Sequence, residues 1–351
     1  MILRRGYPQG YFDGPRYDRG RRNLAGGSLF LKASEGTNRQ GKSECHYNLA
    51  EIDANYISTI FTIIISIFVY NLFLMNQFGG SWTEAKMEII VSYARAYLTI
   101  MNKQAWAKTL YFDGFAGSGL ISSDDSEEIK KGTALRILDI ILPRPFDTYY
   151  FVELDEDYKR SLEAHINTNY FGRNAHVVKG DCNTKLVEMA KYLKKNTNFR
   201  SLAFVDPYGM SVNWNSIEAL KGLGIDLWIL VPTGLGINRL LKKNGDIRPS
   251  WIKKLEQFLG MSLEEILEHF YKEHTTNTLF GEETIVEKER NAVLKCGELY
   301  RSRLSGVFTY VSDSFIMRNK HHSIMYHFMM ATNNARALKI ANDVIKPKYK
   351  S

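Results

Sequence analysis

Cysteine is scarce in this chain of 351 residues, which has only Cys45, Cys182 and Cys296, far apart in the sequence. Such a set cannot form the disulfide framework of a small secreted domain and supplies no CxxC half-site for a metal. An excess of acidic residues is also absent, because 46 Lys/Arg face 38 Asp/Glu, a net charge of +8 that favours a polyanionic partner. With 44% apolar and 24% charged residues, the composition excludes wholesale disorder and a polytopic membrane protein.

Regular periodicity is missing from residues 1–50, which we predict to be disordered. Residues 57–75 carry no charge and are long enough to cross a membrane as a helix. The alternative is that translation begins at Met75, so that residues 1–74 are an extension outside the mature protein. We favour this second interpretation, because the run is rich in residues that A/T-rich codons encode. The protein is then cytoplasmic, and it is membrane-anchored only if residues 57–75 are expressed.

Short apolar runs alternate with helical patterns over residues 75–239, the predicted core. The strands are expected at 109–112, 149–154, 175–180, 201–206 and 226–232. The helices are expected at 81–102, opened by a capping box, and at 133–141, 156–167, 184–194 and 214–220, with a loop at 122–131. Continuous apolar strands separated by helices predict a parallel sheet covered on both faces. Its ligand should lie beyond the carboxyl ends of the strands.

The last third is predicted to add an insertion and to complete the core. Residues 240–300 are predicted to be a helical insertion or a small subdomain, helical over residues 249–273 and with a capping box from Ser262 to Glu265. Residues 301–351 are expected to supply two antiparallel strands, at 307–312 and 323–332, and a closing helix. The result is a seven-stranded α/β sheet. Residues 236–351 carry a net charge of +6, whereas residues 75–235 carry −1, so a basic flank is expected beside a neutral centre.

The first predicted strand ends in Asp113-Gly-Phe-Ala-Gly-Ser-Gly119. Glycines at this point allow the backbone to pass close to a ligand, and the following segment can offer free N–H groups. The spacing is GxxGxG rather than the GxGxxG of a dinucleotide fold. A merely tight turn is an equal alternative.

Acidic residues follow the next two strands. We assign Glu153 to the two hydroxyls of a ribose and Asp155 to a helix N-cap. Asp181 could bond an exocyclic amine, although an N-cap role is the competing interpretation. Cys182 is expected to be a small buried residue rather than a nucleophile.

Asp206-Pro207-Tyr208-Gly follows the fourth strand and is the more specific motif. A carboxylate can bond an amino group, and an aromatic ring beside a rigid proline can stack on a planar base. The alternative is a simple Pro-Gly turn.

Together the runs DGFAGSG, FVELD, GDCN and FVDPYG resemble the motifs of class I S-adenosylmethionine-dependent methyltransferases. DGFAGSG is one residue from the DPFxGSG signature of nucleic-acid amino-methyltransferases, and DPYG is similar to their (D/N/S)PP(Y/F) motif, without its second proline. Over residues 79–345 the chain more closely resembles the three-Cys-motif partner protein (TcmP) family, through GGSWTEAKMEIIVSYARAY, DLWILVPTGLGINRLL and MMATNNARALKIANDVI. The three cysteines of that name belong to a partner protein. In that family a winged-helix-like module occurs in the region of residues 240–300.

The resemblance implies a Rossmann-like class I methyltransferase sheet that binds S-adenosylmethionine. It implies that the methionine end of the cofactor is wrapped by Asp113, Phe115, Ala116, Gly117 and Gly119. Glu153 would bind the ribose, and Asp181 and Cys182 the adenine. Asp206, Pro207 and Tyr208 would face the substrate.

Two functions follow as hypotheses. The first is a methyltransferase acting on nucleic acid or on a nucleobase amine. The alternative is a non-catalytic partner that keeps the fold and binds a companion protein, such as the three-Cys-motif protein, or nucleic acid through the basic C-terminal third. No metal site is predicted, because the basic group at residues 318–322 lacks a carboxylate or cysteine at ligand spacing. A phosphate-facing loop is the better interpretation of that group.

Overall fold

The computed structural model describes residues 36–37, 43–44, 82–123, 126–243, 245–278 and 281–349. The chain divides into two compact units, Met1–Phe73 and Leu74–Ser351. In the first unit β1 (Gly36–Thr37) pairs antiparallel with β2 (Ser43–Glu44). The rest of the predicted disordered segment, the apolar run 57–75 and Met75 lie outside the described residues. Among the helices that are described, none is long and apolar enough to cross a membrane.

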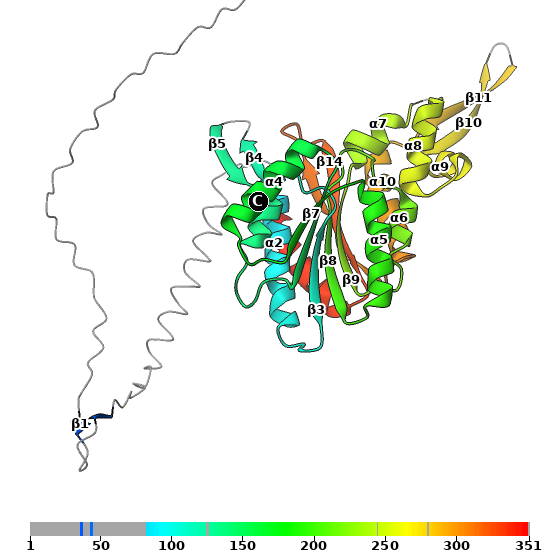
Figure 1. The fold of residues 1–351 in the computed structure, drawn as a ribbon. Coiled ribbons are helices and arrows are strands. Elements are labelled where there is room, and N and C mark those ends of the chain that lie inside the picture. Colours follow the sequence, from blue (N-terminus) through cyan, green and yellow to red (C-terminus); the bar gives the residue numbers. More distant parts are fainter. Residues whose placement is uncertain are drawn as a thin grey trace, which may run out of the picture. The chain divides into compact units, whose positions relative to one another are not determined.

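The second unit is built on a mixed sheet of eight strands, drawn in Figure 1. Five parallel strands lie in the order β7–β6–β3–β8–β9. Their bounds are β3 (Lys108–Asp113), β6 (Thr148–Glu153), β7 (Ala175–Lys179), β8 (Phe199–Val205) and β9 (Ile225–Val231). Next to β9 lies β14 (Ile324–Thr332), which runs antiparallel to it and also pairs with β12 (Tyr310–Val311) and β13 (Phe315–Arg318). This order, with one antiparallel strand inserted near the end, confirms the predicted Rossmann-like class I methyltransferase fold.

Both faces of the sheet are buried, which explains why its strands read as continuous apolar runs. Neighbouring residues of β3 point in opposite directions, so Tyr111 belongs to one hydrophobic cluster and Phe112 to the other. Both side chains are 0% exposed, and burial of such a ring stabilises the fold by about 1.5–3 kcal/mol. One cluster includes residues of α2 (Trp82–Met101), α3 (Thr133–Leu138), α4 (Glu156–Asn169) and α11 (Ala335–Ile345). The other includes residues of α5 (Cys182–Lys195), α6 (Trp214–Glu218) and α10 (Ala292–Ser305).

The loop predicted at residues 122–131 is wrong. Strands β4 (Leu120–Ser123) and β5 (Ser126–Lys131) form an antiparallel hairpin, with Leu120 opposite Lys131. A pattern-based prediction misses such a hairpin, because its polar sequence carries no alternating apolar face. The pairing satisfies backbone groups of the segment locally.

The insertion at residues 240–300 contains helices and also a strand pair. The segment predicted to be helical at 249–273 forms two helices, α8 (Pro249–Leu259) and α9 (Leu263–Phe270). Gly260, with φ of 64°, ends α8, and the predicted capping box at Ser262 starts α9. An antiparallel hairpin of β10 (Tyr271–Thr278) and β11 (Gly281–Lys288) follows. In Figure 1 this hairpin extends away from the sheet.

The strand pair predicted near the C-terminus is confirmed in type but not in extent. The segment expected as a strand at 307–312 contributes only the two residues of β12, and β13 supplies a further partner for β14. The sheet therefore has eight strands rather than seven. After β9 the chain forms a π-helical turn, η1 (Thr233–Ile237), and the short α7 (Asn238–Leu240), and η2 (Lys346–Tyr349) closes the described chain.

Candidate functional site

The strand order reverses between β3 and β8, which are neighbours in the sheet. From β3 the chain continues to β6 and β7 on one side, and from β8 it continues to β9 on the other. In open α/β sheets such a switch point is where ligands bind, beyond the carboxyl ends of the strands. Asp113 is the last residue of β3, and Asp206 directly follows β8. The two sequence motifs with the clearest chemical content therefore meet at this point.

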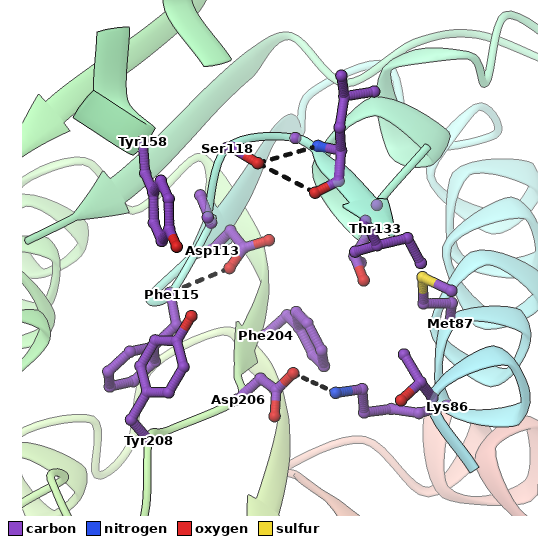
Figure 2. Close-up of a pocket in the computed structure, with 17 residues that line it drawn as sticks. Lys86, Met87, Asp113, Phe115, Ser118, Thr133, Tyr158, Phe204, Asp206 and Tyr208 are labelled. Atoms are coloured by element: carbon purple, nitrogen blue, oxygen red, sulfur yellow. Dashed lines mark hydrogen bonds and ion pairs between the residues drawn. The ribbon is translucent and has the colours of Figure 1, made fainter. Parts of the chain in front are cut away.

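A cavity of about 470 Å³ lies there, as Figure 2 shows. It is lined by Thr83, Lys86, Met87, Asp113, Phe115, Ala116, Gly117, Ser118, Gly119, Leu120, Ile121, Gly132, Thr133, Tyr158, Phe204, Asp206 and Tyr208. Seven of the predicted site residues are among these: Asp113, Phe115, Ala116, Gly117, Gly119, Asp206 and Tyr208. The other four, Glu153, Asp181, Cys182 and Pro207, are not part of the lining.

The glycine loop after β3 turns at two residues with positive φ, Gly117 at 65° and Gly119 at 82°. A Cβ atom added at Gly117 would meet nothing within 4 Å, so the backbone there borders open space. A Cβ at Gly119 would lie 2.8 Å from Cδ1 of Leu162. The first glycine therefore leaves room beside the cavity, and the second allows the loop to pack against α4.

Glu153 fixes the position of this loop by accepting a hydrogen bond from its backbone. Its Oε2 accepts a hydrogen bond of 2.8 Å from the backbone N–H of Gly117, and its Oε1 accepts one of 2.9 Å from Asp155. The residue is 5% exposed. A carboxylate has about four acceptor positions, so these two bonds leave capacity for ribose hydroxyls. Asp155 itself caps α4, as predicted, by accepting from the N–H groups of Asp157 and Tyr158.

Asp181 and Cys182 occupy the first turn of α5. Asp181 is the N-cap and accepts a 3.1 Å hydrogen bond from the N–H of Thr184, which fits the competing interpretation from the sequence. Cys182 is buried, as expected, and its Sγ would lie 2.5 Å from a Cβ at Gly114. Burial raises the pKa of the Cys182 thiol, so a thiolate nucleophile is disfavoured there. The assignment of both residues to adenine stays a prediction.

Lys86 of α2 is a charged residue of the cavity lining that the sequence motifs did not indicate. Its ammonium group forms an ion pair with Oδ2 of Asp206 (Figure 2). The Lys86 side chain is 7% exposed and that of Asp206 25%. A signal was present in the sequence, because Lys86 precedes Ile89, Ile90 and Tyr93 by helical spacing and so lies on the buried face of α2. A lysine on such a face needs a partner.

Asp113 is the second carboxylate of the cavity and is 1% exposed. It accepts hydrogen bonds from the N–H of Phe115, at 3.1 Å, and from the hydroxyl of Tyr111, at 3.4 Å. Burial, with a further contribution from the charge of Asp206, raises the pKa of Asp113 from 3.8 to about 7, against the lowering effect of the Phe115 hydrogen bond. Near neutral pH this carboxyl can therefore hold a proton that an exposed aspartate would lose.

Tyr208 and Phe115 form the aromatic side of the cavity. Their ring centroids are 6.4 Å apart and the planes meet at 78°, an edge-on contact. Tyr208 is 74% exposed, so its ring presents surface to an incoming planar group. Pro207 beside it is buried, which fixes the backbone that carries Tyr208.

These residues fit S-adenosylmethionine. The cavity volume is within the range of small-molecule sites, about 300–1,000 Å³. The open backbone at Gly117, the carboxylate of Asp113 and the adjacent Glu153 are suited to a ligand with an amino acid end and a ribose. Within the described ranges no group of three or more His, Cys, Asp or Glu is arranged to hold a metal ion.

No family model and no curated protein sequence matches the chain. Among solved structures, protein LPL1258 of Legionella pneumophila, of family-model DUF519, is 12% identical, with a TM-score of 0.39 over 77% of this chain and 94% of that one. Trm1 of Pyrococcus horikoshii in complex with S-adenosyl-L-methionine is 10% identical, with a TM-score of 0.33 over 76% and 73%. An S-adenosylmethionine-dependent methyltransferase of Clostridium acetobutylicum is 8% identical, with a TM-score of 0.28 over 69% and 91%. Likeness at this level carries no functional argument, and the fold class rests on the strand order.

Proposed function

We propose that this protein is an S-adenosylmethionine-dependent methyltransferase that acts on an amino group of a nucleic-acid base. One observation carries the proposal: the glycine loop after β3 and the Asp206–Tyr208 motif after β8 line the same cavity, at the switch point of the sheet. A cofactor loop and an acceptor motif on two adjacent strands bring two reactants together, which is the main requirement of a transfer reaction.

The cofactor would be held by the residues between Asp113 and Gly119, with Glu153 on its ribose. Bound there, S-adenosylmethionine supplies an electrophilic methyl group. Phe115 and Ala116 offer apolar surface beside it, and the open backbone at Gly117 leaves room for the ligand. Asp181 and Cys182 begin α5, at the carboxyl edge of β7, where an adenine ring could reach their backbone.

Asp206 would act on the methyl acceptor. Its Oδ2 accepts from Lys86, and its Oδ1 can accept a hydrogen bond from the amino group of the target base. As the amino nitrogen gains a methyl group, positive charge develops on it. The Asp206 carboxylate can stabilise that charge and then accept the proton that the nitrogen loses. Tyr208, exposed and edge-on to Phe115, would stack on the ring of the base.

A non-catalytic partner protein is the second candidate. The ion pair between Lys86 and Asp206 favours it, because a carboxylate already engaged by an ammonium group is a poorer acceptor for a target amine. The absence of the second proline of the amino-methyltransferase motif agrees with this alternative. In that case the fold would bind a companion protein or nucleic acid without transferring a methyl group.

We also propose, from the sequence motifs alone, that the chain is related to the three-Cys-motif partner family. A three-Cys-motif protein is then a candidate companion and also a candidate methyl acceptor. A pull-down with such a protein tests this point separately, and retention of the two proteins at equal amounts would support it. The proposed cofactor site does not depend on the outcome.

Isothermal titration calorimetry of the full chain with S-adenosylmethionine tests the cofactor site. Saturable binding is expected, with loss of binding when Gly117 is replaced by valine, whose side chain would enter the open space beside the loop. Absence of binding to the folded wild-type protein would contradict the methyltransferase proposal. Binding without transfer to DNA, RNA or a three-Cys-motif protein would favour the second candidate.

A further inference from the structure

Two short segments of the last third, residues 239–254 and residues 318–322, are locally basic. Residues 239–254 carry six Lys/Arg and one Asp, and residues 318–322 carry two Lys/Arg, two His and no acid. Residues 256–289, which include α9 and the β10–β11 hairpin, carry nine Asp/Glu and two Lys/Arg. The insertion is therefore not uniformly basic. The six cations of residues 239–254 precede α9, and the hairpin carries more acidic than basic residues.

The six cations of residues 239–254 are all exposed, and they are Arg239, Lys242, Lys243, Arg248, Lys253 and Lys254. Two of them face one aromatic ring: Nζ of Lys242 and Cζ of Arg248 each lie 4.9 Å from the ring centroid of Trp251. Trp251 is partly buried against the core. It therefore holds two like charges in fixed positions near each other. Within the described part of the chain, no carboxylate forms an ion pair with any of the six.

The N-terminus of α8 lies among these cations. Arg248 is its N-cap, the cap makes no side-chain hydrogen bond, and the first turn contains no acidic residue. A helix N-terminus carries a partial positive charge, so a cation there is unfavourable by about 0.3–1 kcal/mol. An anionic ligand at this end of the helix would relieve this repulsion. The local arrangement costs stability in the free protein and suits a phosphate group.

The fold brings residues that flank the two basic segments close together. A Cβ atom at Gly234 would lie 1.9 Å from the carbonyl oxygen of Ile324, so only glycine permits this close approach of η1 to β14. A second cavity, of about 400 Å³, lies at this contact and is lined by Gly234, Leu235, Asn238, Val293, Ser323, Ile324 and Met325. In this lining Asn238 is the first residue of α7, and Ser323 directly follows the basic turn 318–322.

The same region adjoins the proposed acceptor site. A Cβ at Gly236, three residues before Arg239, would lie 3.2 Å from Cγ of Met210, which belongs to the loop that follows Asp206. Burial, and then the nearby charge of Asp206, raise the pKa of Tyr326 in β14. The beginning of α7 and the beginning of β14 are therefore both close to the Asp206 loop.

We propose that the exposed cations of residues 239–254 and the turn 318–322 bind the phosphate backbone of a nucleic acid and deliver an unpaired base to the cavity at Asp206. The inference rests on the proposed function, because it takes the cavity at Asp206 as the site of methyl transfer. It adds that the substrate is a polynucleotide rather than a free base. The base must be unpaired, because a stacked base cannot enter the cavity. Lys242 and Arg248 both lie over the ring of Trp251, so a base would compete with them for that ring. Its role is to hold the cations.

Fluorescence anisotropy on the full chain, without cofactor, tests the surface. The probes are fluorescein-labelled single-stranded RNA and single-stranded DNA of mixed sequence, about 20 nucleotides long. The test variant combines Lys242→Gln, Lys253→Gln and Lys254→Gln. The matched control combines Lys191→Gln, Lys194→Gln and Lys195→Gln, three exposed lysines in the second half of α5. Circular dichroism checks that both variants keep the fold.

The test variant should bind both oligonucleotides about tenfold or more weakly, and the slope of log K against log salt should fall by about 2, since each lost phosphate contact removes roughly 0.7. The control should bind like the wild type. Equal loss in the two variants, or no loss in either, would overturn the proposal, as would displacement of the oligonucleotide by polyglutamate as effectively as by unlabelled oligonucleotide. Calorimetry with S-adenosylmethionine is independent of this result, so failure of the cofactor site and failure of the surface are distinguishable.

Discussion

Lys86 and Asp206, 120 positions apart in the sequence, form an ion pair inside the cavity. The pair joins α2, the first described helix of the sheet-containing unit, to the acceptor loop after β8. Because the lysine side chain is almost fully buried, its charge requires this carboxylate. The pair therefore connects the stability of the core to the geometry of the proposed methyl-transfer site.

Replacing Lys86 by methionine should lower the free energy of unfolding by about 1–3 kcal/mol, because it leaves the partly buried Asp206 carboxylate without this partner. Urea denaturation followed by circular dichroism measures the change. In the double variant with Asp206→Asn the loss should be smaller than the sum of the two single losses. Strict additivity of the two substitutions would contradict an energetically coupled pair.

Alanine at Gly117 and at Gly119 should have different effects. Both positions have positive φ, so each substitution costs about 1 kcal/mol in backbone strain. At Gly119 the new methyl group also meets Leu162 at 2.8 Å, and this variant should lose clearly more stability. At Gly117 the methyl group enters open space, so cofactor affinity should fall more than stability. Thermal unfolding and calorimetry measure the two effects, and equal losses of stability in both variants would contradict the assigned roles.

Tyr208 is predicted to contribute to substrate binding and not to the stability of the fold. Since its side chain is 74% exposed, Tyr208→Ala should change the unfolding free energy by less than about 0.5 kcal/mol. Methyl transfer should fall roughly 10- to 100-fold, the loss that one stacking contact gives. Tyr208→Phe keeps the ring and should retain most of the activity. A phenylalanine variant as inactive as the alanine variant would show that the hydroxyl, and not the ring, is required.

Asp113 should make stability fall as the pH rises. Its pKa in the folded protein is about 7 and its ordinary value 3.8, so between these values the folded state holds a proton that the unfolded chain has lost. Asp113→Asn cannot ionise. Relative to that variant, the wild type should lose about 2–4 kcal/mol of unfolding free energy between about pH 4 and pH 7.

Urea titrations of both proteins across this pH range measure the difference. His327 acts in the opposite direction, because burial lowers its pKa from 6.5 to about 4, so its contribution is lost as the pH falls below 6.5. That contribution is present in both proteins and cancels in the comparison. Parallel stability curves for the wild type and Asp113→Asn would mean that Asp113 is ionised throughout the range.

The sheet could be predicted from the sequence because each of its parallel strands is marked by a short apolar run of its own. Residues such as Tyr111 and Phe112 face opposite hydrophobic clusters, so the strands appear as uninterrupted apolar runs with turn residues behind them. The strand ends then indicated where Asp113 and Asp206 would meet. Helical spacing could place Lys86 on the buried face of α2, but only the tertiary structure identifies its partner Asp206, which lies 120 positions away.

The two hairpins were missed for a different reason. The sequences of residues 120–131 and 271–288 are rich in charged and hydroxyl side chains and contain no regular alternation of apolar residues, so periodicity gives no strand signal. Their strands are defined by backbone pairing. The β-branched residues Thr275, Thr276, Ile285 and Val286 and the glycine at the turn were the available indications of the second hairpin.

The most direct test of the central claim is transfer of a labelled methyl group from S-adenosylmethionine to single-stranded RNA or DNA by the full chain. Asp206→Ala serves as the control, because it removes the proposed acceptor group while leaving the glycine loop intact. The account predicts label in nucleic acid with the wild type and a loss of about 100-fold or more with the variant. No transfer by a wild-type protein that binds the cofactor, or equal transfer by both proteins, would contradict it.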